Sequence, residues 1–146
     1  QQSHIHCIPS PTSITIKGYS ILLYHGMSLT YYADTIEPLR KEGGVNNPAA
    51  LMEYVLELRH LGPTYGSTPV LPVDPDPLLI ATIPDVFMIG HLHKALVHTY
   101  KNILCVSGCS WISQTGYQKA KNITPDVAVP QYITLPSGEV EKFGHQ

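Results

Sequence analysis

The fold of this chain is decided by the stretch Tyr19-Ser20-Ile21-Leu22-Leu23-Tyr24-His25-Gly26, which is typical of a strand that ends at a histidine. Its centre is continuously apolar, as expected of a strand that is covered on both faces. The preceding residues 13–16 alternate between polar and apolar types, and Lys17-Gly18 can form a turn. The two segments therefore predict a β-hairpin whose second strand delivers His25 at its carboxyl end.

A second stretch repeats this arrangement, because the apolar residues 85–89 predict a buried strand and are followed by Gly90-His91-Leu92-His93. In extended geometry two residues that are two apart project to the same side, so His91 and His93 are expected to converge. Neutral imidazole is the commonest metal ligand, and the carboxyl ends of strands in an open α/β sheet form its usual binding crevice. We predict that His25, His91 and His93 bind a metal centre.

The alternative for Gly90-His91-Leu92-His93 is a polar turn in which one histidine is hydrogen-bonded to the backbone. The motif alone does not separate these interpretations, since short patterns of this kind also arise by chance in a chain rich in histidine and glycine. The occurrence of another histidine at a strand end, in His25-Gly26, favours metal binding over the polar turn.

The segment between the two strands predicts helices and a loop. Asn47 can cap a helix that has Pro48 in its first turn and is ended by Gly62-Pro63, whereas Pro38 prevents a long uninterrupted helix over residues 29–42. Residues 62–77 contain five prolines and two glycines and predict an ordered surface loop able to cover a site.

The second half of the chain predicts further strands. Residues 95–100 and 103–106 form one expected pair, and residues 132–135 pair with 139–143 across 136–138. In this strand-rich part we interpret Trp111 and Tyr117 as core residues in preference to base-stacking ones. The predicted fold class is α/β, with mixed β-sheets and flanking helices.

Size and charge limit the possible functions. A chain of 146 residues that is 43% hydrophobic fits one compact domain. Only 14% of the residues are charged, against about 25% in typical domains, so part of the surface is expected to face another protein or a missing segment. The net charge of -2 provides no basic footprint, and a nucleic acid would have to be held locally or through metal ions.

The sequence also indicates the compartment. The absence of a long apolar run or a signal peptide predicts a soluble, cytoplasmic protein that has no membrane partner. Cys7, Cys105 and Cys109 contain no C-x-x-C pair, which argues against a disulfide framework and a zinc ribbon. We expect all three cysteines to be reduced, buried thiols.

The stretches that end at His25-Gly26 and at His93 resemble the last two motifs of calcineurin-like metallophosphoesterases. In that family these histidines ligate a dinuclear centre. Earlier family motifs supply the bridging carboxylate, further ligands and the general-acid histidine, and none of these motifs is present here. The resemblance implies that residues 1–146 form the C-terminal half of a phosphoesterase sandwich, as part of a single metallophosphoesterase domain.

A narrower resemblance covers nearly all of the chain. The run from Ser107 to Lys119, with residues 24–29 and 59–66, is similar to the small subunit of archaeal family-D DNA polymerase, although Cys109 and Gly116 depart from that pattern. It implies a metal-dependent 3′–5′ exonuclease that proofreads for a replicative polymerase, with an OB-fold upstream.

This resemblance also implies the partners and cofactors. The expected partners are the large catalytic subunit, in a heterodimer, and a DNA 3′ end, in a nucleoid-associated protein of the cytoplasm. The expected cofactors are two divalent ions, of which Mn²⁺ favours mixed oxygen and imidazole ligands. We expect this part of the domain alone to bind metal weakly or not at all, and to be inactive.

Two alternatives to a nuclease remain. The domain could be a structural polymerase subunit without catalysis, or a stand-alone phosphoesterase that acts on small phosphate esters. Retention of His25, His91 and His93 favours the nuclease over the structural subunit.

Overall fold

The structure is a computed structural model that describes residues 5–135 and 139–142. Its elements are, in chain order, β1 (Thr12–Ile16), β2 (Tyr19–Tyr24), α1 (Met27–Thr35), α2 (Glu37–Lys41), the 3-10 helix η1 (Gly44–Asn46), α3 (Pro48–Glu57), β3 (Val86–Ile89), β4 (Leu96–Tyr100), β5 (Ile103–Ser107), α4 (Gly116–Ala120), β6 (Gln131–Thr134) and β7 (Glu139–Lys142).

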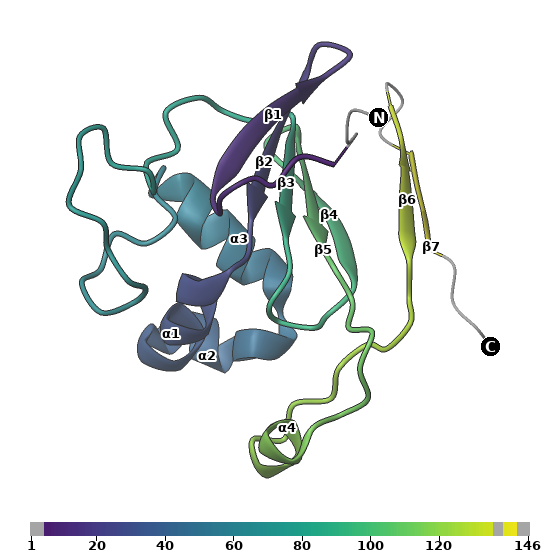
Figure 1. The fold of residues 1–146 in the computed structure, drawn as a ribbon. Coiled ribbons are helices and arrows are strands. Elements are labelled where there is room, and N and C mark those ends of the chain that lie inside the picture. Colours follow the sequence, from purple (N-terminus) through teal and green to yellow (C-terminus); the bar gives the residue numbers. More distant parts are fainter. Residues whose placement is uncertain (1–4, 136–138, 143–146) are drawn as a thin grey trace.

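A five-stranded sheet in the order β1-β2-β3-β5-β4 forms the centre of the molecule. The three inner strands are parallel, whereas β1 and β4 pair antiparallel at the edges. Helices α1 to α3 lie on one side of this sheet, and the antiparallel pair β6-β7 lies on the other (Figure 1). The predicted α/β class with mixed sheets and flanking helices is confirmed.

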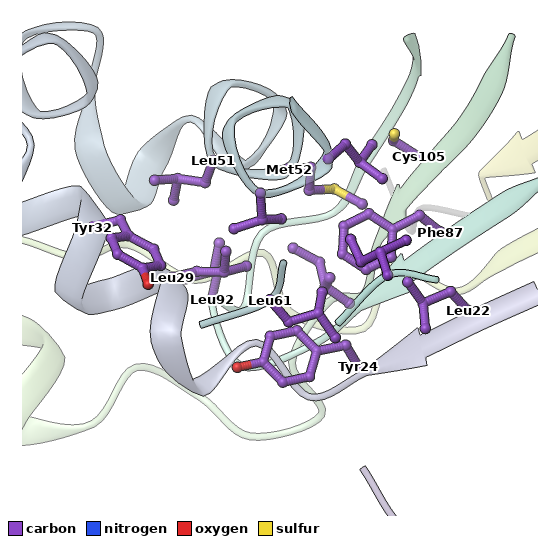
Figure 2. Packing of buried hydrophobic residues seen from close by; sticks show 14 of the residues in the cluster. Leu22, Tyr24, Leu29, Tyr32, Leu51, Met52, Leu61, Phe87, Leu92 and Cys105 are labelled. Carbon is purple, nitrogen blue, oxygen red and sulfur yellow. The ribbon is translucent and has the colours of Figure 1, made fainter. Parts of the chain in front are cut away.

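The side chains of the inner strands alternate between two clusters. Phe87 and Cys105 point toward the helices and join the main core, whereas Val86 and Val106 point to the opposite face, where Ile133 packs on them. The main core is closed by fully buried residues of α1 and α3, and Figure 2 shows Met52 of α3 beside Phe87, with Leu29, Tyr32 and Leu51 farther along the same cluster. Apolar cover on both faces explains why β2 and β3 have continuously apolar sequences.

Helix α3 begins as the sequence predicts. Asn47 Oδ1 accepts a hydrogen bond from the Ala50 backbone N–H at 3.4 Å, and Pro48 occupies the first turn. The helix ends at Glu57, before the expected Gly62-Pro63, because Arg59 adopts a left-handed φ of 54°. The Arg59 guanidinium donates to the Ile80 carbonyl at 2.7 and 2.9 Å, and this contact ties the helix end to a distant segment.

The other secondary-structure predictions are largely confirmed. Residues 12–16 and 19–24 form the predicted hairpin, and β4 and β5 pair as expected. The helices before residue 42 are interrupted between α1 and α2, consistent with the effect expected of Pro38. The pairing of β6 with β7 is also confirmed, although residues 136–138 and 143 of that prediction lie outside the described residues.

The prediction that Trp111 and Tyr117 are core residues is wrong. Their exposed fractions are 73% and 70%, because residues 108–130 form loops and the short helix α4, which lies away from the sheet (Figure 1). The expectation of buried thiols holds only for Cys105, whose pKa burial raises to about 12. Cys7 is exposed in the segment before β1, and Cys109 is partly exposed.

No helix in the described part of the chain is long and apolar enough to cross a membrane.

Candidate metal centre

Strands β2 and β3 end side by side. They are parallel, with Tyr24 opposite Ile89, and the Gly90 backbone N–H donates to the His25 carbonyl at 3.2 Å. Because parallel strands present their carboxyl ends at one edge, the residues that follow them meet there. The strand-end positions that the sequence predicts for His25 and His91 are therefore confirmed.

His25 and His91 are in direct contact. His91 Nδ1 lies 3.0 Å from His25 Nε2, and the ring centroids are 4.8 Å apart at an interplanar angle of 62°. Gly26 permits this approach, since its φ is +102° and a Cβ added there would lie 3.4 Å from both His91 Cβ and Leu29 Cδ1. A side chain at residue 26 would strain the backbone, and its Cβ would be in van der Waals contact with His91.

The geometry of the G-H-x-H segment differs from the extended geometry that the sequence analysis assumes. His91 and His93 both have a φ of 58°, in the left-handed region that non-glycine residues seldom adopt. The Leu92 backbone N–H donates to the Gly90 carbonyl at 2.6 Å, and the Leu92 side chain is buried in the main core. The chain therefore bends at each histidine so that Leu92 can turn inward, and the two imidazoles have different neighbours.

The ring of His93 contacts helix α4, whereas the rings of His25 and His91 contact each other. Gln118 Nε2 lies 2.9 Å from His93 Nδ1, and the Asp126 backbone N–H donates to the His93 carbonyl at 2.8 Å. The sequence analysis assigns no role to Gln118. The run Thr115-Gly116-Tyr117-Gln118 has the spacing of a capping box, which could have placed Gln118 at the start of a helix but not beside His93.

The electrostatics favour a neutral imidazole at His91. Burial lowers the pKa of His91 below its ordinary value, and the neighbouring His25 and His93 lower it further. The neutral ring is the form that can bind a metal ion.

A groove of about 1020 Å³ adjoins these histidines. His91 and His93 line it together with α1, α4 and part of the 62–77 loop, which was expected to cover a site. Two of its tyrosines are strongly exposed, Tyr65 at 94% and Tyr117 at 70%. The other lining residues are Met27, Thr30, Tyr31, Asp34, Val45, Gly66, Ser67, Thr68, Pro69, Val70, Leu92, Thr115, Gln118, Lys121 and Ile123.

The separation of the His25 and His91 nitrogens matches that of two ligands of one metal ion, and in this structure the two nitrogens hydrogen-bond each other. Two nitrogens bonded to one ion at about 2.1 Å and at right angles to each other lie about 3 Å apart, and the His25–His91 nitrogens are separated by 3.0 Å. Within the described residues, no three side chains of His, Cys, Asp or Glu are grouped so that they could hold an ion. The structure thus brings His25 and His91 together, whereas His93 is hydrogen-bonded to Gln118.

No protein-family model matches the chain. Among solved structures, Vps29 from Entamoeba histolytica, complexed with Zn²⁺, has a TM-score of 0.42 and 17% sequence identity, over 96% of this chain and 62% of that one. Similarity at this level is too low to carry an argument about fold or metal binding.

Curated proteins give a clearer result. The chain is 37% identical over 132 residues to the DNA polymerase II small subunit of Halobacterium salinarum, covering 90% of this chain and 26% of that protein. It is 36% identical over 135 residues to the Thermoplasma acidophilum subunit, covering 92% and 26%. With the Methanocaldococcus jannaschii subunit the identity is 30% over 145 residues, covering 99% and 23%. The chain is therefore similar, along nearly its whole length, to the archaeal DNA polymerase II small subunits, and it spans about a quarter of the length of these relatives.

Proposed function

We propose that this chain contributes three histidines to the metal centre of a 3′–5′ exonuclease, within the small subunit of a replicative DNA polymerase. The observation that supports this most directly is the His25–His91 contact, with nitrogens 3.0 Å apart at the ends of two parallel strands. This contact occurs in a chain that is similar to polymerase small subunits over about 90% of the chain's own length. His93 is the third ligand of the proposal.

The reaction proposed is hydrolysis of a phosphodiester bond with two divalent ions, of which Mn²⁺ suits a mixture of imidazole and oxygen ligands. Such ions supply an activated water and stabilise the developing charge on phosphate. The residues of this chain would hold the ions through neutral imidazole nitrogens. The carboxylate ligands and the general-acid histidine would come from the rest of the same domain, of which residues 1–146 would be the C-terminal part.

The groove beside the histidines supports a DNA 3′ end as the substrate. Tyr65 and Tyr117 offer exposed aromatic faces on which unpaired bases can stack, and Lys121 lies in the same groove. With a net charge of -2, the chain has little long-range attraction for DNA. Binding would depend on these local contacts and on the ions.

The large catalytic subunit is the proposed partner, in a heterodimer. Trp111 and Ile112 are exposed at 73% and 57%, and an exposed apolar pair of this kind suits a protein interface. The small proportion of charged residues, 14%, agrees with a surface that is partly covered in the assembly. The assembly would act at the nucleoid in the cytoplasm.

The test uses the full-length subunit and measures Mn²⁺-dependent release of nucleotides from the 3′ end of end-labelled single-stranded DNA. Replacing His91→Ala should lower the rate by about a hundredfold or more, since it removes a proposed ligand. The control is His98→Gln, because His98 lies on β4 and bonds Glu53 Oε1 at 2.6 Å, outside the proposed centre. Unchanged activity in His91→Ala would show that the metal assignment is wrong.

The same assay separates the alternatives. A structural subunit would bind the large subunit but release no nucleotides at any Mn²⁺ concentration. A phosphoesterase for small substrates would hydrolyse a panel of small phosphate esters and leave DNA intact.

A further inference from the structure

Gln118 is a buried side chain that joins helix α4 to His93. Its exposed fraction is 8%, and its Nε2 lies 2.9 Å from His93 Nδ1. The proposed function assigns no role to this residue. Its hydrogen bonds determine which atoms of the amide face the histidine.

The capping box at the start of α4 fixes the orientation of the amide. The Thr115 backbone N–H donates to Gln118 Oε1 at 2.9 Å, and the Gln118 backbone N–H donates to Thr115 Oγ1 at 3.2 Å. A backbone N–H can only donate, so the atom that faces it must be the amide oxygen. Rotating the amide by half a turn would place its NH₂ group against the Thr115 N–H, with two donors facing each other.

This orientation determines the proton position on His93. The NH₂ group of Gln118 can only donate, so His93 Nδ1 accepts, and the neutral ring carries its proton on Nε2. In that tautomer the Nδ1 lone pair is occupied by Gln118, and Nε2 has no lone pair for a metal ion. The Asp126 N–H, which donates to the His93 carbonyl at 2.8 Å, also holds the backbone of this residue.

We propose that Gln118 is a positioning residue that holds His93 in a tautomer unable to ligate a metal, so that His93 enters the centre only by separating from Gln118. The metal part of this inference rests on the proposed function, whereas the tautomer does not. Metal-bound histidines usually donate their second ring nitrogen to a carboxylate or a carbonyl. The amide of Gln118 gives the opposite arrangement.

Gln118→Glu is the informative substitution, because glutamate at this position preserves the capping box. One carboxylate oxygen can accept a hydrogen bond from the Thr115 N–H while the other accepts a hydrogen bond from the Nδ1–H of His93. The His93 ring would then change tautomer and expose the Nε2 lone pair. Ala120→Glu is the matched control, because it adds the same charge to an exposed position of α4, on the opposite side of that helix from Gln118.

The first measurement is a two-bond ¹H–¹⁵N correlation spectrum of the 146-residue chain, without metal, in alkaline buffer where imidazole is neutral. His93 should carry its proton on Nε2 in the wild type and in Ala120→Glu, and on Nδ1 in Gln118→Glu. A wild-type His93 protonated on Nδ1 would overturn the inference, and so would a Gln118→Glu spectrum with an unchanged tautomer. If that variant fails to fold, Gln118→Met replaces it and should populate both tautomers.

The second measurement adds Mn²⁺ to the full-length subunit, which would include the oxygen ligands of the proposed centre, and follows paramagnetic broadening of its labelled histidine ring signals. His25 and His91 should broaden before His93 in the wild type, and His93 should broaden at about tenfold lower Mn²⁺ in Gln118→Glu. An unchanged His93 response in that variant would overturn the positioning role. Absence of broadening at all three histidines would contradict the proposed metal centre and leave the tautomer result standing, so the two failures are distinguishable.

Discussion

The helix-covered face of the sheet and the carboxyl edge of the same sheet are built by different rules. On the face, Phe87 and Leu51 are surrounded by other apolar side chains, and their spacing in sequence predicts their burial. At the edge, His25 contacts His91 from 66 residues away, and His93 contacts Gln118 from 25 residues away. The face is specified by local periodicity, whereas the edge depends on long-range polar pairs and a left-handed turn.

The largest expected effect concerns the face. Phe87→Ala should lower the free energy of unfolding by about 3–5 kcal/mol, because it leaves a cavity between the sheet and α3. Its control is Met88→Ala, at the next residue, which points to the smaller cluster and is only partly buried. Urea unfolding of both variants measures the difference, and equal losses would contradict the assignment of the main core.

The edge is tested by Gly26→Ala. The φ of +102° makes alanine costly, by about 1–2 kcal/mol in unfolding free energy, and the new Cβ would touch the His91 side chain. Gly66→Ala is the control, because Gly66 has a φ of +89° and nothing within 4 Å of an added Cβ. Both variants should be destabilised, but only Gly26→Ala should shift the His91 ring resonances. Identical shifts in both would argue against the close approach of residue 26 to His91.

The stability that Asp76 contributes near the end of the 62–77 loop should be lost in acid. The Leu78 N–H, donating at 2.8 Å, and then the His60 ring at 3.0 Å lower the pKa of the Asp76 carboxyl below its ordinary value. A carboxyl with a lowered folded pKa stabilises the fold above its unfolded pKa of ~3.9, and this contribution is lost as the pH falls through the folded value.

The measurement is the stability difference between the wild type and Asp76→Asn as a function of pH. It should be constant above about pH 5 and shrink below about pH 4. If the stability difference grew as the pH fell, the pKa of Asp76 would be raised by folding and the prediction would be wrong.

The smallest effect is expected at Ser107, the last residue of β5. Its side chain is fully buried, and its hydroxyl has no hydrogen-bond partner within the described part of the chain. Ser107→Ala should therefore be neutral or stabilising by up to about 1 kcal/mol in thermal or urea unfolding. Ser28→Ala is the contrast, because the equally buried Ser28 hydroxyl bonds Tyr24 and Leu61 and its loss should destabilise by about 1–3 kcal/mol. Equal responses would show that the two hydroxyls do not differ in hydrogen bonding.

The sequence predicts those parts of this molecule whose causes are local. The hairpin turn at Lys17-Gly18, the Asn47 cap and the apolar strands before His25 and His91 each follow from neighbouring residues. The left-handed turn at His91 could not be predicted in this way, because it depends on burial of Leu92 beneath helices that lie elsewhere in the chain.

Dependence on distant parts of the chain also explains the wrong prediction for Trp111 and the missed contact of Gln118. The exposure of Trp111 follows from the position of the 108–130 segment, which lies beyond the carboxyl edge of the sheet and covers neither of its faces. The contact of Gln118 with His93 requires the fold to bring α4 to the carboxyl edge. A capping box indicates where a helix begins but not what its side chains contact.

The central claim is that the histidines of this edge supply only the nitrogen share of a centre whose oxygen ligands lie elsewhere in the small subunit. Calorimetric titration of Mn²⁺ into the full-length subunit, as wild type and as His91→Ala, tests this claim most directly. We predict two bound ions in the wild type and at least about a tenfold loss of affinity in His91→Ala. Equal stoichiometry and affinity in the two proteins would contradict it.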